Sequence, residues 1–121
     1  MIALLDTTNE AARLLKPKLN ERLPQTALEI FASYPALRQR LCQLDEAQVL
    51  TILAADSHEQ LQQFRELRRL FADMPIVLIL PDTDPETIRL GHRLYPRFVN
   101  SRGANLNDLV MVVARMNAMV P

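Results

Sequence analysis

The chain has 121 residues, and its 14 basic and 14 acidic side chains leave it with no formal net charge. This balance argues against nucleic acid or an anionic membrane as the main partner, because both attract a basic excess. Hydrophobic residues make up 49% of the chain, but no apolar run approaches the roughly 20 residues that span a bilayer, so we expect one globular domain over residues 1–121.

The first half of the chain contains three apolar runs, each followed by a helical pattern. The runs cover residues 2–5, 27–32 and 49–53. Thr7 and Glu10 have capping-box spacing before the first helix, and Pro17 should end or bend it, which makes residues 16–26 a connection. Tyr34 and Pro35 should open the second helix. A stripe of large apolar residues from Leu61 to Leu70 predicts the third.

The second half repeats this alternation twice. Residues 75–80 form the strongest strand pattern of the chain, and Asp84 with Pro85 should begin the helix after it. Residues 97–100 are a short strand candidate. The last helix should run from about Leu106 to Val120, capped by Asn105 or Asn107.

Five strand–helix units of this length predict an α/β fold with a parallel sheet and helices on both faces. The runs at 2–5, 49–53 and 75–80 are continuously apolar, as strands buried on both faces are. The run at 27–32 contains Glu29 and the run at 97–100 is short, which is typical of edge strands. We therefore expect the flavodoxin-like (βα)5 order 2-1-3-4-5.

In length, units and inferred strand order, the chain resembles a response-regulator receiver (CheY-like) domain. The resemblance implies acids after strand 1 that hold Mg²⁺, and a phosphoacceptor aspartate at the end of strand 3. Asp6 is the single acid after strand 1, and it is followed by Thr7. Leu53, Ala54 and Ala55 occupy the end of strand 3, where the phosphoacceptor would fall.

The resemblance also implies a Thr or Ser at the end of strand 4 and a Lys at the end of strand 5. Leu80 and Pro81 occupy the first position, and neither has a hydroxyl group. The second position is surrounded by three residues without a lysine, which are Asn100, Ser101 and Arg102. Of the implied constellation, only Asp6 carries over.

Asp56 is the remaining candidate phosphoacceptor, but it lies three residues beyond Leu53. Ser57 and Gln60 have the spacing of a capping box, so Asp56 should stand just outside a helix N-terminus. A negative charge there is favoured by roughly 0.3–1 kcal/mol. We prefer this interpretation of Asp56 to a chemical one.

A cation site is a second hypothesis for the same edge of the sheet. Asp6, Asp56 and Asp82, with Asp84 beside them, could supply the hard oxygen ligands that Mg²⁺ or Ca²⁺ prefers. The alternative is helix capping, because each of these residues precedes a helix. His58 and His92 have no companions at the spacing of a zinc site.

The last helix has too few polar residues for one that is exposed along its outer face. Leu109, Val113 and Met116 form the stripe suited to the sheet, with Val120 one turn further on. Three other apolar side chains point elsewhere, namely Met111, Val112 and Met119. They predict an interface, since exposed methionine-rich patches suit protein recognition. The alternative is that they pack against the first and fourth helices.

The sequence therefore predicts a pseudo-receiver that acts by protein–protein contact without phosphorylation. We expect a homodimer, no enzymatic activity and no cofactor. The single cysteine, Cys42, forms no internal disulfide and should be a small core residue, which favours the cytoplasm. Two alternatives stay open: a flavodoxin-like domain that binds a small ligand or cation at the sheet edge, and a receiver phosphorylated at Asp56.

Overall fold

The computed structural model describes residues 2–5, 10–101 and 103–119. Its elements, in chain order, are β1 (Ile2–Leu5), α1 (Glu10–Arg22), β2 (Leu28–Phe31), α2 (Tyr34–Leu41), the short 3-10 helix η1 (Glu46–Gln48), β3 (Leu50–Ala54), α3 (His58–Leu70), β4 (Ile76–Leu80), α4 (Pro85–His92), β5 (Phe98–Ser101) and α5 (Leu106–Met119). The five strands form one parallel sheet in the order β2-β1-β3-β4-β5, which confirms the predicted fold class and strand order. No helix among the described residues is both long enough and apolar enough to cross a membrane.

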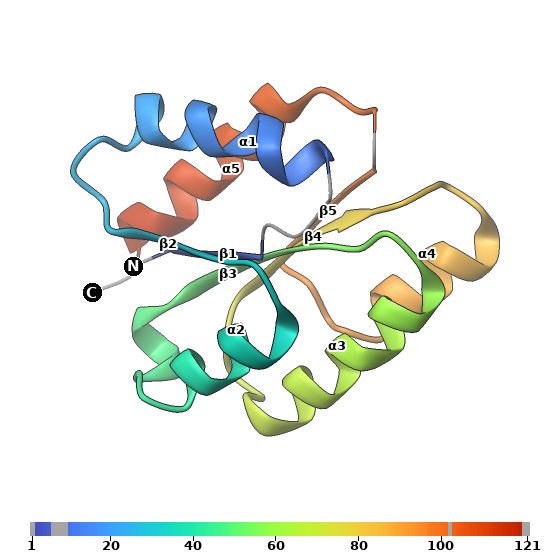
Figure 1. Ribbon diagram of the computed structural model, residues 1–121. Helices are drawn as coiled ribbons and strands as arrows, with labels where there is room; N and C mark the ends of the chain where they lie inside the picture. Colours follow the sequence, from blue (N-terminus) through green and yellow to red (C-terminus); the bar gives the residue numbers. More distant parts are fainter. Residues whose placement is uncertain (1, 6–9, 102, 120–121) are drawn as a thin grey trace.

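The sheet separates two hydrophobic cores. Helices α1 and α5 cover one face, and α2, α3 and α4 cover the other (Figure 1). Successive residues of a strand point to opposite faces, so Ile52 enters the core under α1 and α5 while Leu53 enters the core under the other three helices. Strands β3 and β4 are buried along their whole length, which is why their sequences read as continuous apolar runs.

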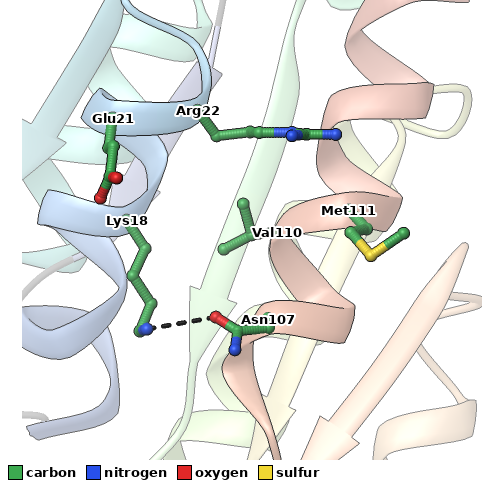
Figure 2. Close-up of a pocket in the computed structure, with 6 residues that line it drawn as sticks. All are labelled: Lys18, Glu21, Arg22, Asn107, Val110 and Met111. Atoms are coloured by element: carbon green, nitrogen blue, oxygen red, sulfur yellow. Dashed lines mark hydrogen bonds between the residues drawn. The ribbon is translucent and has the colours of Figure 1, made fainter.

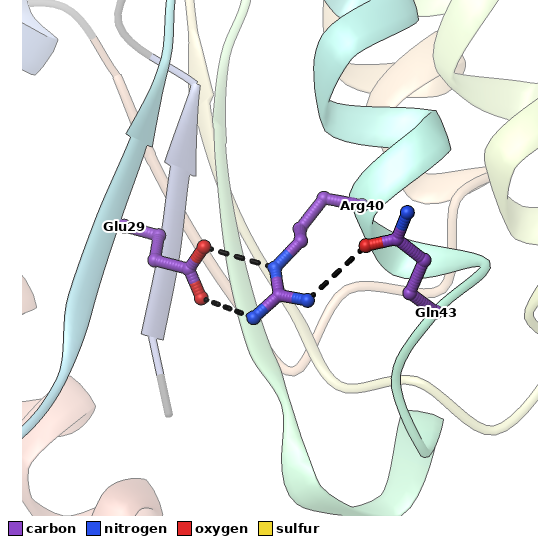
Figure 3. Close-up of polar contacts among 3 residues, drawn as sticks. All are labelled: Glu29, Arg40 and Gln43. Carbon is purple, nitrogen blue, oxygen red and sulfur yellow. Dashed lines mark hydrogen bonds and ion pairs between the residues drawn. The ribbon is translucent and has the colours of Figure 1, made fainter.

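The edge strand β2 keeps its one charged residue by pairing it. Glu29 accepts two hydrogen bonds from the Arg40 guanidinium of α2, at 2.9 and 3.2 Å, and Arg40 also donates to Gln43 (Figure 3). The two-toothed Arg–carboxylate geometry fixes α2 against the strand. Its net contribution to stability is small because both side chains are partly exposed.

Two predictions about local structure are wrong. Helix α1 continues through Pro17 to Arg22, because Leu15 and Leu19 are both buried in the core on either side of the proline. Cys42 is exposed rather than buried, because it follows the last buried residue of α2, Leu41, at the point where that helix ends. Thr7, the predicted cap of α1, lies outside the described residues.

Candidate functional site

The carboxyl ends of the five parallel strands lie along one edge of the sheet, which we call the carboxyl edge. The end of the central strand β3 at this edge is apolar. Ala54 and Ala55 are both buried, and the backbone N–H of Ala55 bonds to the carbonyl of Ile79 in β4 at 3.0 Å. Two methyl groups therefore stand where the resemblance places a phosphoacceptor carboxylate.

Asp56 belongs to the start of α3. Ser57 is the N-cap residue, and its Oγ accepts a hydrogen bond from the Gln60 backbone N–H at 3.2 Å. The Gln60 side chain reaches back and accepts from the Asp56 backbone N–H at 2.5 Å, one residue earlier than in the usual capping box. The predicted helix-capping role of Ser57, with Asp56 just outside the helix, is confirmed.

The end of β4 also lacks the implied hydroxyl group at the strand itself. Leu80 is buried and the half-buried Pro81 follows it. The next residue, Asp82, accepts a hydrogen bond on Oδ1 from the Asp84 backbone N–H at 3.0 Å. Asp84 is the N-cap residue of α4, as predicted, but its side chain makes no capping hydrogen bond.

A hydroxyl group does enter this region from α4. Thr87 is fully buried, and its Oγ1 lies 2.6 Å from Nε2 of His58 at the start of α3. The same hydroxyl hydrogen-bonds to the Asp82 carboxylate and holds the pKa of that group below its ordinary value of 3.8, with help from the Asp84 N–H and the nearby His58. Since a hydroxyl has one proton to donate, Nε2 of His58 must be the donor to Thr87.

This Asp82–Thr87–His58 chain is structural rather than catalytic in its geometry. A nucleophile triad needs the histidine between the hydroxyl and the carboxylate, whereas here the hydroxyl is in the middle. The hydroxyl is also enclosed, so a substrate cannot reach it. The chain ties the starts of α3 and α4 together across the carboxyl edge. Sequence reasoning missed it, because Thr87 lies 29 residues from His58 and only the parallel register of β3 and β4 brings them together.

The end of β5 has amide chemistry in place of the implied lysine. Asn100 accepts from the Ser101 backbone N–H at 2.9 Å and donates to the Asn105 carbonyl at 3.4 Å. Asp6 and Arg102 lie outside the described residues. Within the described residues, no three His, Cys, Asp or Glu side chains gather in a way that could hold a metal ion.

The last helix presents part of the predicted patch. Leu109 and Val113 are buried against the sheet and Met116 packs on the same core, which confirms the described part of the predicted stripe. Met111 is 46% exposed and Val112 is half-buried. Met119 is the last described residue of α5, but its side chain lies outside the description. Helix α5 runs beside α1 (Figure 1).

Comparisons with known proteins agree on the fold. No protein-family model matches the chain, and no curated protein matches it. Solved structures do match along almost its whole length. An orphan response regulator of H. pylori aligns with a TM-score of 0.72 at 9% identity, covering 97% of this chain and 96% of that one.

Two further structures give the same result. A response regulator receiver domain from Rhodospirillum rubrum aligns with a TM-score of 0.70 at 11% identity, covering 98% and 92% of the two chains. A response regulator from Thermotoga maritima aligns at 0.65 and 12% identity, covering 97% of each chain. At these identities the likeness shows the receiver-like fold and nothing finer.

Proposed function

We propose that this chain is a pseudo-receiver: a single receiver-like domain over residues 1–121 that acts in two-component signalling without being phosphorylated. The observation that carries the proposal is the pair of buried alanines, Ala54 and Ala55, at the end of β3. A receiver needs a carboxylate there to accept a phosphoryl group, and an alanine side chain has no nucleophile.

The surrounding positions support the same conclusion. Leu80 and Pro81 end β4 without a hydroxyl group, and the hydroxyl nearby, on Thr87, is committed to Asp82 and His58. The Gln60 side chain binds the backbone beside Asp56. These side chains satisfy one another, which favours a structural carboxyl edge over an enzyme site, a ligand site or a phosphorylated Asp56.

In this proposal the chain acts by protein–protein contact, in the cytoplasm and without enzymatic activity. The predicted contact lies on the last helix, at Met111, Val112 and Met119, where the partner would be a second copy of the chain or another signalling protein. The exposed Met111 side chain supports it, since a large apolar side chain held in water gains free energy when a partner covers it.

The proposal is tested by challenging the protein with acetyl phosphate or beryllofluoride in the presence of Mg²⁺. We expect an unchanged intact mass and no saturating amide shifts at the carboxyl edge. Asp56→Asn serves as the matched variant and should respond like the wild type. A phosphoryl adduct that forms on the wild type and disappears in Asp56→Asn would overturn the pseudo-receiver proposal.

A further inference from the structure

Helices α1 and α5 lie side by side and leave a groove between them, which we call the α1/α5 seam. Its main hollow has a volume of about 540 Å³ and is lined by both helices (Figure 2). A second hollow of about 340 Å³ lies between the start of α1 and the loop that leads from β5 into α5. Together they follow α1 from Glu10 to Arg22, which is its whole length.

The seam has an apolar floor and apolar walls. Val110 of α5 is buried at its centre. Leu14 of α1 is 53% exposed and Met111 of α5 is 46% exposed, so each helix contributes one large apolar side chain that water surrounds on about half of its surface. An apolar groove between two helices suits the apolar face of a third helix, which packs its ridge of side chains into it.

The charges along the seam are mainly positive. Lys18 reaches across to a neutral partner, Oδ1 of Asn107, at 3.2 Å. Arg22 extends toward α5 and makes no ion pair with any described residue, while the Glu21 side chain stays on the α1 side of the groove (Figure 2). Over its exposed surface α1 carries four cations and two carboxylates, namely Arg13, Lys16, Lys18, Arg22, Glu10 and Glu21.

We propose that the α1/α5 seam binds an amphipathic helix of another protein, with apolar side chains on one face and carboxylates beside them. This inference rests on the proposed function, because it names the kind of partner that such an interaction module would take. Carboxylates at the rim of the partner helix would meet Lys18 and Arg22, while its apolar face would cover Leu14, Met111 and Val110.

A second copy of this chain does not suit the seam. A two-fold pairing of one seam with another sets the same surface against itself, which brings the cations of the two α1 helices together. A phosphate polymer does not suit it either, because the floor is apolar and the chain as a whole is neutral. Charge complementarity therefore selects an acidic protein helix.

Three stapled helical peptides of about 14 residues, each about 21 Å long, would test the proposal. The first has a leucine stripe flanked by glutamates, the second has the same stripe flanked by lysines, and the third has the glutamates without the leucines. At about 1 mM, where even weak complexes form, each is added to ¹⁵N-labelled full-length protein and the amide shifts are recorded. We expect only the first peptide to give saturating shifts, and these should fall along α1 and α5.

Three variants give the proposal its chemical detail. Arg22→Glu should weaken binding of the first peptide by about tenfold or more, because it replaces an attraction with a repulsion. Leu14→Gln should weaken it as well, by removing an apolar contact from an exposed site that the fold does not need. Arg65→Glu is the matched control, since Arg65 is exposed on α3, on the other side of the sheet, and it should leave binding unchanged.

Shifts that map away from the seam, equal binding of the leucine peptides with glutamates and with lysines, or no binding at all would each overturn the inference. Equal binding of the glutamate peptide without leucines would also overturn it, because binding would then be an ion-exchange effect. These outcomes are separate from the acetyl phosphate test. A phosphoryl adduct would defeat the proposed function and leave the peptide shifts in place, whereas absent shifts would leave the phosphorylation result untouched.

Discussion

At the scale of single residues, Thr87 shows how the carboxyl edge is built. A buried hydroxyl group without partners would cost the protein the free energy of removing it from water. Thr87 has two partners, Asp82 and His58, which come from different strand–helix connections. Its hydroxyl therefore replaces water and joins the start of α4 to the start of α3.

The change Thr87→Val should lower the free energy of unfolding by about 1–2 kcal/mol, because valine keeps the volume but removes both hydrogen bonds. Thr51→Val is the matched control: Thr51 is equally buried, but its hydroxyl contacts only the thioether of Met74, a weak acceptor. Thr51→Val should be close to neutral. Urea unfolding curves of the two variants measure the difference, and equal losses would show that the Thr87 hydrogen bonds contribute little.

The same change should alter the response to acid. The pKa of Asp82 is lower in the folded protein than its ordinary value of 3.8, so its carboxylate contributes stability that is fully present above that value. This contribution disappears as the pH falls through the lowered folded pKa. In Thr87→Val the pKa of Asp82 should rise toward 3.8, and carboxyl ¹³C titration by NMR would detect the rise. An unchanged pKa would mean that the Asp84 N–H alone holds it down.

Ser57 is the other residue at this edge with a defined task. Ser57→Ala should lower the free energy of unfolding by about 1 kcal/mol, as the loss of a helix cap does. Ser33, whose Oγ caps α2 by accepting from the Ala36 N–H at 3.3 Å, is the matched site, and Ser33→Ala should cost a similar amount.

Asp56→Asn should cost less than Ser57→Ala, because the backbone hydrogen bond from residue 56 to Gln60 remains and only an interaction between a charge and the helix dipole is lost. Denaturant unfolding of the three variants gives the order directly. A larger loss at Asp56 than at Ser57 would assign the Asp56 carboxylate a stronger partner than the helix dipole.

At the scale of whole elements, α1 shows why a sequence rule can fail. A proline in the interior of a helix removes one backbone hydrogen bond and costs about 3 kcal/mol. Burying Leu15 and Leu19 on either side of Pro17 offsets this cost, because each fully buried leucine is favoured by roughly 1.5–3 kcal/mol. Pro17 itself is exposed.

Helix α4 depends on the small size of one residue. Gly91 is buried against β4, and a Cβ atom at this position would lie 2.8 Å from Cδ2 of Leu80 and 3.2 Å from Cδ2 of Leu78. Gly91→Ala should therefore lower the free energy of unfolding by about 1 kcal/mol, since overpacking by about 1–3 kcal/mol outweighs the gain in helix propensity of about 1 kcal/mol.

A double-mutant cycle checks the cause. In a Leu80→Ala background the space is open, so Gly91→Ala should become stabilising through its helix propensity alone. Chemical unfolding of the four proteins measures the coupling. If Gly91→Ala has the same effect in both backgrounds, contact with Leu80 does not limit the packing of α4.

The strands were predictable because their apolar periodicity is a local property of the sequence. The runs at 2–5, 27–32, 49–53, 75–80 and 97–100 each coincide with an observed strand to within one residue. The strand order followed from Glu29 and from the contrast between continuous and interrupted runs. The hydrogen-bond chain through Thr87 was not predictable, since it depends on how α3 and α4 sit over the ends of β3 and β4.

At the scale of the whole molecule, the neutral net charge hides an uneven distribution. The exposed cations of α1 border the seam, while Asp82, Asp84 and Glu86 gather where β4 leads into α4. Met111 lies where the seam meets the outer face of α5. Both proposed contacts use this side chain, so a helix in the seam and a second copy on α5 would compete for it.

We expect the wild-type protein to self-associate through α5, with Met111 in the contact. Met111→Glu should weaken the association by about tenfold or more, because the new carboxylate would be buried without a partner. The fold should survive, since the Met111 side chain is 46% exposed. Leu70→Glu is the matched control, because Leu70 is 51% exposed on α3, and it should leave the association unchanged. Sedimentation velocity at about 100 µM, where an interface of micromolar Kd is mostly formed, measures the association, and circular dichroism checks the fold. A wild-type chain that stays monomeric there would exclude the homodimer and leave the acidic helix as the partner for which Met111 is exposed.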